Sequence, residues 1–343
     1  MPKVELHCHL EGSFPFSLVV DEYRRQGIPL PSDDEAALRE YFLIERPCEH
    51  LDGFLDKFAH LQKIFGDLDA LERLTTVAVE GKHNEGVKLL ELRFAPTFIA
   101  HGWGHSFSSI LSAIQRGVKR ACERCENGIH VGLICIAVGA SGHQEFDRTA
   151  TFALEHRDAL VGFDIAGSEL HPEQYAPWMD KIHEAGMPIT IHAAEDRVSG
   201  LPENAAIAVD RLHARRIGHG IQTIKDRALW RRLIDQQVTF ELCPTSNYLT
   251  NAVDSLEAHP IGEFLSGGAR VCLSSDDPGI MACDLPREYE VCHEVLGLTE
   301  DDFRRMNVTA LEASFCDGGV KASVRAKWAN WFADSKPDCV KGG

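Results

Sequence analysis

Short apolar runs rich in β-branched residues recur along the chain, each bounded by turn-forming residues, and this pattern predicts β-strands. Between them, apolar residues at spacings of three and four follow Pro, Ser or Asp, which predicts amphipathic helices. Examples of these helices are residues 67–85, 108–124, 172–185, 202–213 and 226–236. The eight predicted strands are residues 3–9, 87–96, 131–138, 160–167, 188–195, 215–220, 239–247 and 269–278.

Strands and helices that alternate eight times predict an α/β fold in which a parallel sheet closes into a TIM-type (β/α)8 barrel. A second regularity supports the barrel, because several predicted strands end in ionisable, polar or glycine residues. In this fold those carboxyl ends open on one face, where active sites are built. Ordinary turns also end strands with polar residues, but they favour Gly, Asn, Asp and Ser rather than histidines. The sequence therefore predicts one site assembled from dispersed strand ends.

The segment from about residue 11 to residue 87 is too long for a simple crossover between strands. It carries helical patterns, including residues 18–25 and 51–64, and we interpret it as a helical insertion after the first strand. Such an insertion near the barrel mouth is placed to cover a substrate. The 343 residues are predicted to form a single barrel domain, with residues from about 334 to 343 as a loose tail.

Composition narrows the function classes. No apolar run approaches the roughly 20 residues of a membrane span, and the amino terminus enters a strand-like pattern without a signal peptide, so we expect a cytoplasmic protein without a membrane partner. The formal net charge of -17 repels nucleic acid and anionic lipid, which favours a small neutral substrate instead.

The 11 cysteines are scattered rather than arranged as a disulfide framework. Only Cys122 and Cys125 form a CxxC pair, which lies in a helix-like stretch with no second pair, and we interpret it as incidental. Cys135 and Cys272 lie in strand-like apolar runs and are expected to be small buried hydrophobes in a reducing compartment.

Two histidines on the first predicted strand are the leading candidates for metal ligands. His7 and His9 are two residues apart, so their side chains point to the same side of the strand. A pair satisfied by hydrogen bonds is the alternative, but it leaves His192 and Asp276 unexplained at the ends of other strands. Three histidines and one carboxylate suit zinc, with water as the remaining ligand of a catalytic site.

Other ionisable residues at strand ends are candidates for acid–base chemistry. Glu195 follows His192 by three positions, so the strand has to turn at residues 193–194 for both to reach the mouth, where Glu195 is suited to donating a proton. Asp277 is adjacent to the candidate ligand Asp276 and can face another direction to accept a hydrogen bond. The alternatives are a surface carboxylate at Glu195 and two solvated turn aspartates before a proline.

His219 is flanked by Gly218 and Gly220, which leave backbone room for the close approach of a ligand.

Six short motifs lie in order on the predicted strands, and together they resemble the adenosine deaminase family of the amidohydrolase superfamily over residues 3 to about 315. Each motif alone is weak, but six in register are highly specific. The motifs are residues 4–13 (VELHCHLEGS), 163–169 (FDIAGSE), 190–195 (TIHAAE), 216–220 (RIGHG), 243–247 (CPTSN) and 275–278 (SDDP).

The resemblance implies a hydrolase that acts on C–N bonds of cyclic amidines. It implies that Glu195 protonates purine N1, and that His219 and Asp277 orient a zinc-bound hydroxide for attack on C6. Ammonia then leaves from a tetrahedral intermediate, so adenosine gives inosine. The ligands implied for one zinc ion are His7, His9, His192 and Asp276.

The resemblance also implies substrate contacts, among them the backbone N–H of Gly167 to purine N3. Binuclear relatives typically place a bridging lysine at the end of the fourth strand, whereas this strand ends at residues 164–167 (DIAG), which favours a single ion. The signature of cytidine-type zinc deaminases is absent. The expected substrate contacts are His9, Glu11, Gly167 and Asp277.

Two departures from the family pattern bear on the substrate. Glu11 stands where adenosine deaminases usually have Asp, at a position that resembles the contact to the ribose 5'-hydroxyl. The Leu-Glu-Gly form of residues 10–12 is common in adenine deaminases and other relatives. Ala194 replaces a usual glycine. Residues 165–167 and 244–250 look more like the nucleoside enzymes.

The leading hypothesis is therefore a purine-salvage deaminase of adenosine or 2'-deoxyadenosine. The alternatives are deamination of adenine, or of a modified adenine nucleoside such as aminodeoxyfutalosine. A catalytically silent relative that binds purine or metal is disfavoured, because Glu195, His219 and Asp277 are all present.

Overall fold

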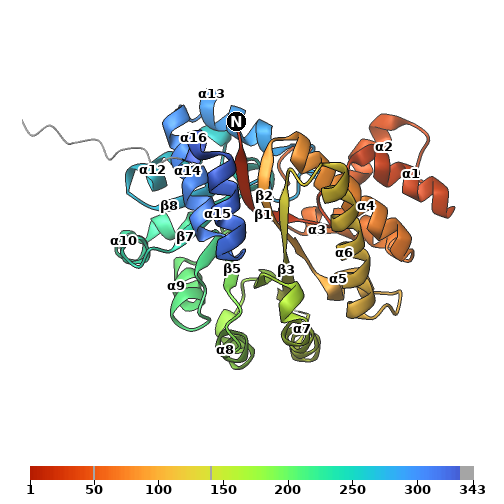
Figure 1. Cartoon of the computed structure of the whole chain (residues 1–343), viewed down its shortest axis with the longest axis horizontal. Helices are drawn as coiled ribbons and strands as arrows, with labels where there is room; N and C mark the ends of the chain where they lie inside the picture. Colours follow the sequence, from red (N-terminus) through yellow and green to blue (C-terminus); the bar gives the residue numbers. More distant parts are fainter. Residues whose placement is uncertain (49–50, 140, 333–343) are drawn as a thin grey trace, which may run out of the picture.

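Eight parallel strands form the centre of the computed structural model, which describes residues 1–48, 51–139 and 141–332 (Figure 1). Neighbouring strands pair in chain order, which confirms the predicted TIM-type (β/α)8 fold. The strands are β1 (Lys3–His9), β2 (Val87–Phe94), β3 (His130–Gly139), β4 (Gly162–Gly167), β5 (Ile189–Ala193), β6 (Arg216–His219), β7 (Thr239–Leu242) and β8 (Arg270–Leu273).

The ring of strands closes through the chain that follows β8. The Asp276 N–H donates to the His7 carbonyl (3.1 Å), and the His9 N–H donates to the Asp276 carbonyl (2.9 Å). Cys8 and Asp276 thereby form an isolated parallel bridge. Since the Asp276 backbone completes the ring, its side chain is held against the carboxyl end of β1.

Some predicted strands extend too far at their carboxyl ends. The predictions 239–247 and 269–278 are wrong beyond Leu242 and Leu273. Pro244 is the first residue of helix α11 (Pro244–Leu249). Proline suits this position because its φ is already helical and the N–H that it lacks has no partner there. Asp276 has a φ of 62°, a left-handed conformation that a continuous strand does not contain.

The long segment between β1 and β2 is helical, as predicted. Its last helix, α4, packs against β2 and α6 and so serves as the ordinary barrel crossover. The additional helices are therefore α1, α2 and α3, a shorter stretch than the predicted insertion of residues 11–87. The helices here are α1 (Phe16–Gln26), α2 (Glu35–Phe42), α3 (Leu51–Leu61), η1 (Gln62–Ile64) and α4 (Leu68–Asn84).

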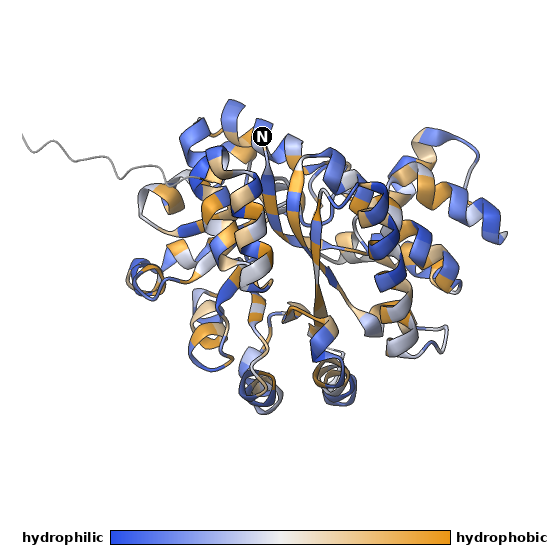
Figure 2. Ribbon diagram, viewed as in Figure 1, coloured by the Kyte–Doolittle hydropathy of each residue, from blue (hydrophilic) through white to orange (hydrophobic). Residues whose placement is uncertain are grey.

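The remaining helices surround the barrel, and Figure 2 shows polar and apolar residues alternating along them, as expected for elements with one buried and one exposed face. The predicted helix 172–185 is divided into η3 and α8, and the predicted helix 202–213 ends at Asp210. These elements are α5 (Pro96–Ala100), α6 (Phe107–Arg124), α7 (His143–Glu155), η2 (Arg157–Ala159), η3 (Pro172–Tyr175), α8 (Ala176–Glu184), α9 (Pro202–Asp210), η4 (Ile221–Lys225), α10 (Arg227–Asp235), η5 (Leu256–Ala258), α12 (Ile261–Ser266), α13 (Leu285–Glu294), α14 (Glu300–Ala313), α15 (Gly318–Lys327) and α16 (Ala329–Phe332).

The interior of the barrel is charged rather than purely apolar. Arg93 Nη1 and Nη2 reach Asp164 Oδ2 (2.7 Å) and Glu241 Oε2 (2.8 Å). Arg216 bridges Glu91 Oε2 (2.7 Å) and Glu241 Oε1 (2.6 Å). All five side chains are buried, so each charge depends on its partners for the stabilisation that water gives elsewhere.

The cysteines in the described ranges are all free. Cys135 and Cys272 are buried as predicted, while Cys122 lies within α6 and Cys125 follows its last residue. Within those ranges no helix combines the length and apolar character needed to cross a bilayer. The predicted tail, residues 334–343, lies outside the described residues.

Candidate metal-dependent active site

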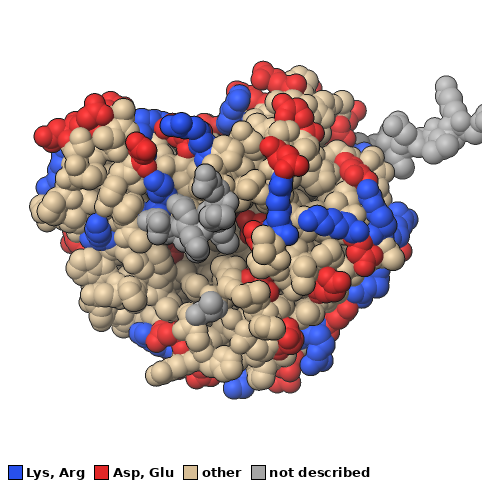
Figure 3. All heavy atoms as spheres, turned by 180° about the vertical axis from the view of Figure 1, so that it is seen from behind, with Lys and Arg blue, Asp and Glu red and all other residues tan. Residues whose placement is uncertain are grey.

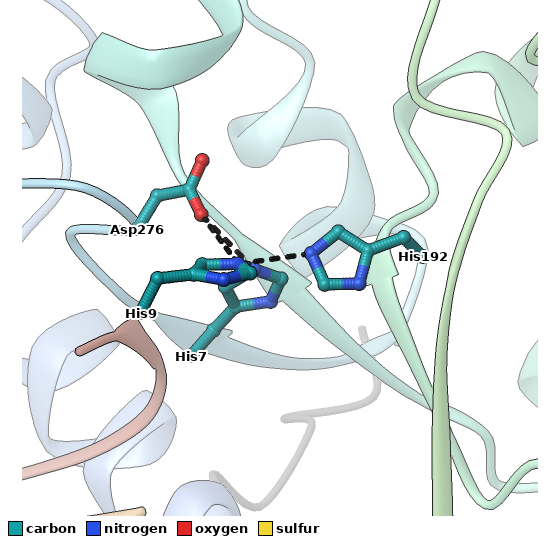
Figure 4. Close-up of side chains that lie close together, drawn as sticks. All are labelled: His7, His9, His192 and Asp276. Atoms are coloured by element: carbon teal, nitrogen blue, oxygen red, sulfur yellow. Dashed lines mark hydrogen bonds and ion pairs between the residues drawn. The ribbon is translucent and has the colours of Figure 1, made fainter. Parts of the chain in front are cut away.

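Four predicted metal ligands converge at the carboxyl end of the barrel (Figure 4). Asp276 Oδ1 lies 3.1 Å from His7 Nε2 and 3.2 Å from His9 Nε2. His9 Nε2 lies 3.3 Å from His7 Nε2 and 3.1 Å from His192 Nε2. The four side chains come from β1, from β5 and from the residue that closes the barrel after β8.

Two buried carboxylates determine which ring nitrogens present a lone pair to the cluster. His7 Nδ1–H donates to Glu241 Oε2 (2.7 Å), and His192 Nδ1–H donates to Asp164 Oδ1 (3.2 Å). The Nε2 atoms of both rings therefore present lone pairs toward each other and toward the Asp276 carboxylate. A metal cation can bind these converging lone pairs. Three imidazoles with one carboxylate fit zinc.

A second group, formed by His219, Cys243 and Asp276, also has three donor atoms close together. It shares Asp276 with the first group. His219 Nδ1 is engaged by Asn247 Nδ2 at 3.1 Å. The first group offers four ligand atoms against three and is therefore the better candidate for an ion.

The predicted turn after His192 is present. Strand β5 ends at Ala193, and Ala194 has a φ of 55°, so the chain turns out of the strand before Glu195. The Glu169 carboxylate holds this turn, because it accepts hydrogen bonds from the N–H groups of Ala194, Glu195 (2.9 Å) and Asp196 (3.2 Å). The Glu195 side chain is 19% exposed and lies on the cavity wall.

Burial raises the pKa of Glu195 well above its usual value, and the negative charges of Asp276 and Glu169 act in the same direction. A carboxyl group with a raised pKa keeps its proton near neutral pH and can donate it. His219 Nε2 lies 3.5 Å from Glu195 Oε2 and 3.9 Å from Asp276 Oδ2. Burial lowers the pKa of His219 well below its usual value. The acid and a neutral imidazole therefore face the cavity together.

Asp277 is buried beside the candidate ligand Asp276, and its Oδ1 has no hydrogen-bond partner among the described residues. The left-handed backbone at Asp276 allows both adjacent side chains to reach the cavity. Burial, followed by the charge of Asp276, raises the pKa of Asp277 well above its usual value. Asp276 Oδ2 is itself held by the Ser246 hydroxyl at 2.7 Å.

The glycines beside His219 have a different role from the one predicted. A Cβ at Gly218 would lie 2.9 Å from His7 Cε1, and a Cβ at Gly220 would lie 2.7 Å from Phe240 Cδ1. The space they leave is therefore filled by protein side chains rather than kept for a ligand.

The candidate site opens into a cavity of about 340 Å³. Its apolar wall includes Phe54 and Phe58 of α3, so one helix of the predicted insertion lies against the site. Gly167 lines the opposite part with a φ of 94°, a conformation that favours glycine. The cavity is lined by every predicted site residue except His7, whose Nε2 reaches Asp276 Oδ1.

Glu11 also lines the cavity and is buried. Its Oε1 accepts a hydrogen bond from the Ala95 N–H at 2.7 Å. Burial raises the pKa of Glu11 to about 7 despite this hydrogen bond. On the outer surface, charges of both signs are scattered around a central hollow rather than gathered into a basic patch (Figure 3).

Sequence reasoning missed the residues that support the predicted site. The signal for two of them was a carboxylate within an apolar strand run, at Asp164 and Glu241, because an interior charge requires a partner. No local pattern indicated that Glu169 would hold the turn before Glu195. The aromatic wall at Phe54 and Phe58 was part of a predicted helix but was not assigned to the site.

The model of the family described as adenosine deaminase matches residues 2–331 of the chain. The chain belongs to the adenosine deaminase family. An adenosine deaminase of Plasmodium cynomolgi (strain B) is 35% identical over 327 residues, which cover 95% of this chain and 89% of the relative. As a member of this family, the chain is a hydrolase that acts on C–N bonds, and the family is metal-dependent.

Two solved structures of deaminases extend the comparison. An adenine deaminase from Arthrobacter aurescens superimposes with a TM-score of 0.88 at 26% identity, covering 96% of this chain and 98% of that chain. The N6-methyl-AMP deaminase of Arabidopsis thaliana gives a TM-score of 0.83 at 26% identity, covering 96% of both chains. The adenosine deaminase family member described here is therefore similar to enzymes that act on a nucleoside, a free base and a nucleotide.

Proposed function

We propose that this chain is a zinc-dependent hydrolytic deaminase that converts adenosine or 2'-deoxyadenosine to inosine or 2'-deoxyinosine with release of ammonia. The observation that carries the proposal is the convergence of four candidate metal ligands with Glu195, His219 and Asp277 beside one cavity. Such a reaction belongs to purine salvage. The free cysteines favour a reducing compartment such as the cytoplasm.

One zinc ion is the metal that best suits the ligand set of three imidazoles and one carboxylate. A zinc ion held by His7, His9, His192 and Asp276 would act as a Lewis acid and lower the pKa of a water molecule toward neutrality. Glu241 and Asp164 hold the rings of His7 and His192 with Nε2 facing the site.

The other residues supply proton transfer and orientation. Protonated Glu195 donates its proton to N1 of the purine ring, which makes C6 a better electrophile. His219 and Asp277 orient the attacking oxygen, and the Gly167 N–H is expected to bind purine N3. Overall, one water is added and one ammonia leaves, so the C6–N bond breaks and a C6–O bond forms.

The cavity favours a nucleoside over a nucleotide. Among its described lining residues there is no lysine or arginine, whereas the carboxylates of Glu11 and Asp277 face it. A 5'-phosphate would lie beside these acidic side chains without a lysine or arginine partner. The aromatic rings of Phe54, Phe58 and Phe98 suit the faces of a purine.

Adenine is the second candidate substrate, and Glu11 is the feature that favours it. Glu11 is one methylene longer than the aspartate expected beside a ribose 5'-hydroxyl, and its side chain is buried against Ala95. The longer side chain would leave less room on this side of the cavity than an aspartate would.

Turnover of a small set of adenine compounds tests both candidates. Zinc-loaded protein is mixed with adenosine, 2'-deoxyadenosine, adenine, aminodeoxyfutalosine or AMP, and loss of the adenine absorbance gives kcat/KM. We expect the two nucleosides to give the highest values and AMP the lowest. A higher value for adenine would assign the alternative, and the absence of turnover with every compound would contradict the proposed reaction.

A further inference from the structure

A buried chain of hydrogen bonds runs from the start of α12 to His219. The Ile261 N–H donates to His259 Nδ1 (3.2 Å). His259 Nε2 lies 3.1 Å from Asn247 Oδ1, and Asn247 Nδ2 lies 3.1 Å from His219 Nδ1. Asn247 is fully buried, and His219 and His259 are 1% and 4% exposed. These side chains are therefore shielded from bulk water.

The first bond determines the direction of all the others. A backbone N–H only donates, so His259 Nδ1 carries a lone pair, and the proton of neutral His259 is on Nε2. Burial lowers the pKa of His259 to about 3, which keeps the ring neutral. His259 Nε2–H then donates to an oxygen, and this requires Asn247 to present Oδ1 to His259 and its NH₂ group to His219.

The Asn247 amide thereby sets the tautomer of the next ring. Its NH₂ group is a donor, so His219 Nδ1 accepts, and the proton of His219 is on Nε2. The reverse tautomer would need the amide to turn and His259 to place a proton on Nδ1, facing the Ile261 N–H. Two buried donors would then oppose each other, which costs the energy of an unmade hydrogen bond.

We propose that His259 and Asn247 are positioning residues that hold neutral His219 as its Nε2–H tautomer, so that His219 meets the reacting atoms as a hydrogen-bond donor. Its Nε2 is the atom that faces the carboxylates of Glu195 (3.5 Å) and Asp276 (3.9 Å). The catalytic meaning of this assignment rests on the proposed deaminase function. A proton lost by the attacking water has to be accepted by a group other than neutral His219.

Four histidines in and behind the candidate site thus divide into two classes. His7 and His192 carry the proton on Nδ1, where Glu241 and Asp164 accept it, and present Nε2 lone pairs. His219 and His259 carry the proton on Nε2. The neighbouring rings of His7 and His219, with centroids 4.8 Å apart, therefore have opposite tautomers.

The backbone holds the hydrogen-bonded chain of His259, Asn247 and His219, called the relay below, in place. The Asn247 carbonyl accepts hydrogen bonds from the N–H groups of Ala252 (2.8 Å) and Val253 (3.1 Å). The preceding residue, Ser246, donates its hydroxyl to Asp276 Oδ2 (2.7 Å). Asn247 therefore lies on the same short helix, α11, as Ser246, which holds the candidate metal ligand Asp276.

Nitrogen NMR of the zinc-loaded wild-type protein measures the tautomers directly. The protein is labelled with ¹⁵N-histidine, and the His219 and His259 signals are assigned by their loss in His219→Asn and His259→Gln. We expect a protonated Nε2 and an unprotonated Nδ1 for both rings. A proton on His219 Nδ1 would overturn the proposal. The tautomers are read from the wild-type protein, and the two variants serve only to assign the signals.

A matched pair of variants tests the relay through His259. His259→Gln retains an amide N–H that can donate to Asn247, whereas His259→Leu fills the space without a donor. We expect His259→Leu to lower kcat about 10- to 100-fold with bound zinc and KM little changed, and to alter the His219 nitrogen signals. His259→Gln is expected to retain more of both. A leucine variant that equals or exceeds the glutamine variant in both readouts would contradict the relay.

The two proposals fail in different ways. If the NMR tautomers are as expected but no adenine compound is turned over, the deaminase function fails and the hydrogen-bond assignment stands. If adenosine is turned over but His219 is protonated on Nδ1, only the relay is wrong.

Discussion

Glu195 is the residue on which the proposed proton transfer depends. It owes its position to two features of the chain before it, the left-handed Ala194 and the Glu169 carboxylate that holds the turn. Its raised pKa follows from burial and from nearby negative charge. A side chain that is both fixed and protonated can donate without first having to acquire a proton.

Replacing Glu195 with glutamine tests this role. Glu195→Gln keeps the size of the side chain but removes the acidic proton, so we expect kcat to fall about 10²- to 10⁴-fold while bound zinc is unchanged. The wild-type kcat/KM should also decrease on the alkaline side, as Glu195 loses its proton above its raised pKa. Steady-state kinetics and elemental analysis give both quantities. Glu203→Gln, an exposed carboxylate on α9, serves as the control, and a near-normal rate for Glu195→Gln would remove Glu195 from the mechanism.

At the scale of the element, strands were predicted better at their starts than at their ends. Apolar, β-branched runs define where a strand begins, and all eight were found. The ends depend on single residues such as Pro244, which starts a helix, and Asp276, whose left-handed φ arises where its backbone joins β1. A contact between residues 8 and 276 is not contained in any local pattern.

The strands also contain buried charges whose pairing the sequence could not show. Asp164 and Glu241 are visible as carboxylates in apolar runs, but their bonds to His192 and His7 depend on which strands are neighbours across the barrel. The relay from His259 through Asn247 to His219 could not be predicted for the same reason. His259 lies just before α12, whereas His219 is the last residue of β6.

The ion pairs between strands predict that removing one buried arginine will greatly lower the stability of the fold. Arg216→Met would leave Glu91 and Glu241 buried without their shared partner, so we expect the free energy of unfolding to decrease by about 3–5 kcal/mol. Urea denaturation of the variant and the wild type measures this difference. The exposed Arg231→Met on α10 is the matched control. If both variants lost equally little stability, the barrel network would not be stabilising in this way.

Glu288 on α13 predicts a pH-dependent stability. Its side chain is fully buried and accepts one hydrogen bond, from the Thr245 N–H at 3.2 Å. Burial raises its pKa to about 8 from an ordinary value of 4.5. The folded protein therefore holds a proton that the unfolded chain releases, and the contribution of Glu288 to stability is lost as pH rises from 4.5 to about 8.

Glu288→Gln has the same shape and no titration. We expect its melting temperature to rise relative to the wild type between pH 5 and pH 8, within the window set by the raised pKa, and the difference to level off above it. Melting curves at several pH values provide the measurement. A difference that stays constant with pH would show that Glu288 titrates normally in the folded protein.

At the scale of the whole molecule, the candidate metal site joins the first strand of the barrel to the residue that closes the ring after the last strand. His7 and His9 come from β1, His192 from β5, and Asp276 from the residue that closes the ring after β8. The sequence was sufficient to predict that these side chains meet, since the carboxyl ends of barrel strands share one face. The sequence did not show which ring nitrogens face the candidate site, because Glu241 and Asp164 determine this from behind the rings of His7 and His192.

A ligand set gathered from such distant parts of the chain exists only when the barrel is folded. Zinc should therefore bind the folded state in preference to the unfolded state and stabilise it, by about 2.7 kcal/mol when free zinc is 100 times its dissociation constant. We expect a chelator to lower the melting temperature and added zinc to restore it, whereas Mg²⁺, which prefers oxygen ligands, should not.

Replacing one ligand separates this effect from a general action of the metal. His7→Ala removes one imidazole from the cluster, so its zinc content by elemental analysis should fall and its melting temperature should no longer respond to zinc. His183→Ala, an exposed histidine on α8, should respond as the wild type does. Full zinc content in His7→Ala would refute the ligand assignment. A melting temperature of the wild type that is insensitive to zinc would show that the ion does not link β1, β5 and the closing residue as the converging side chains require.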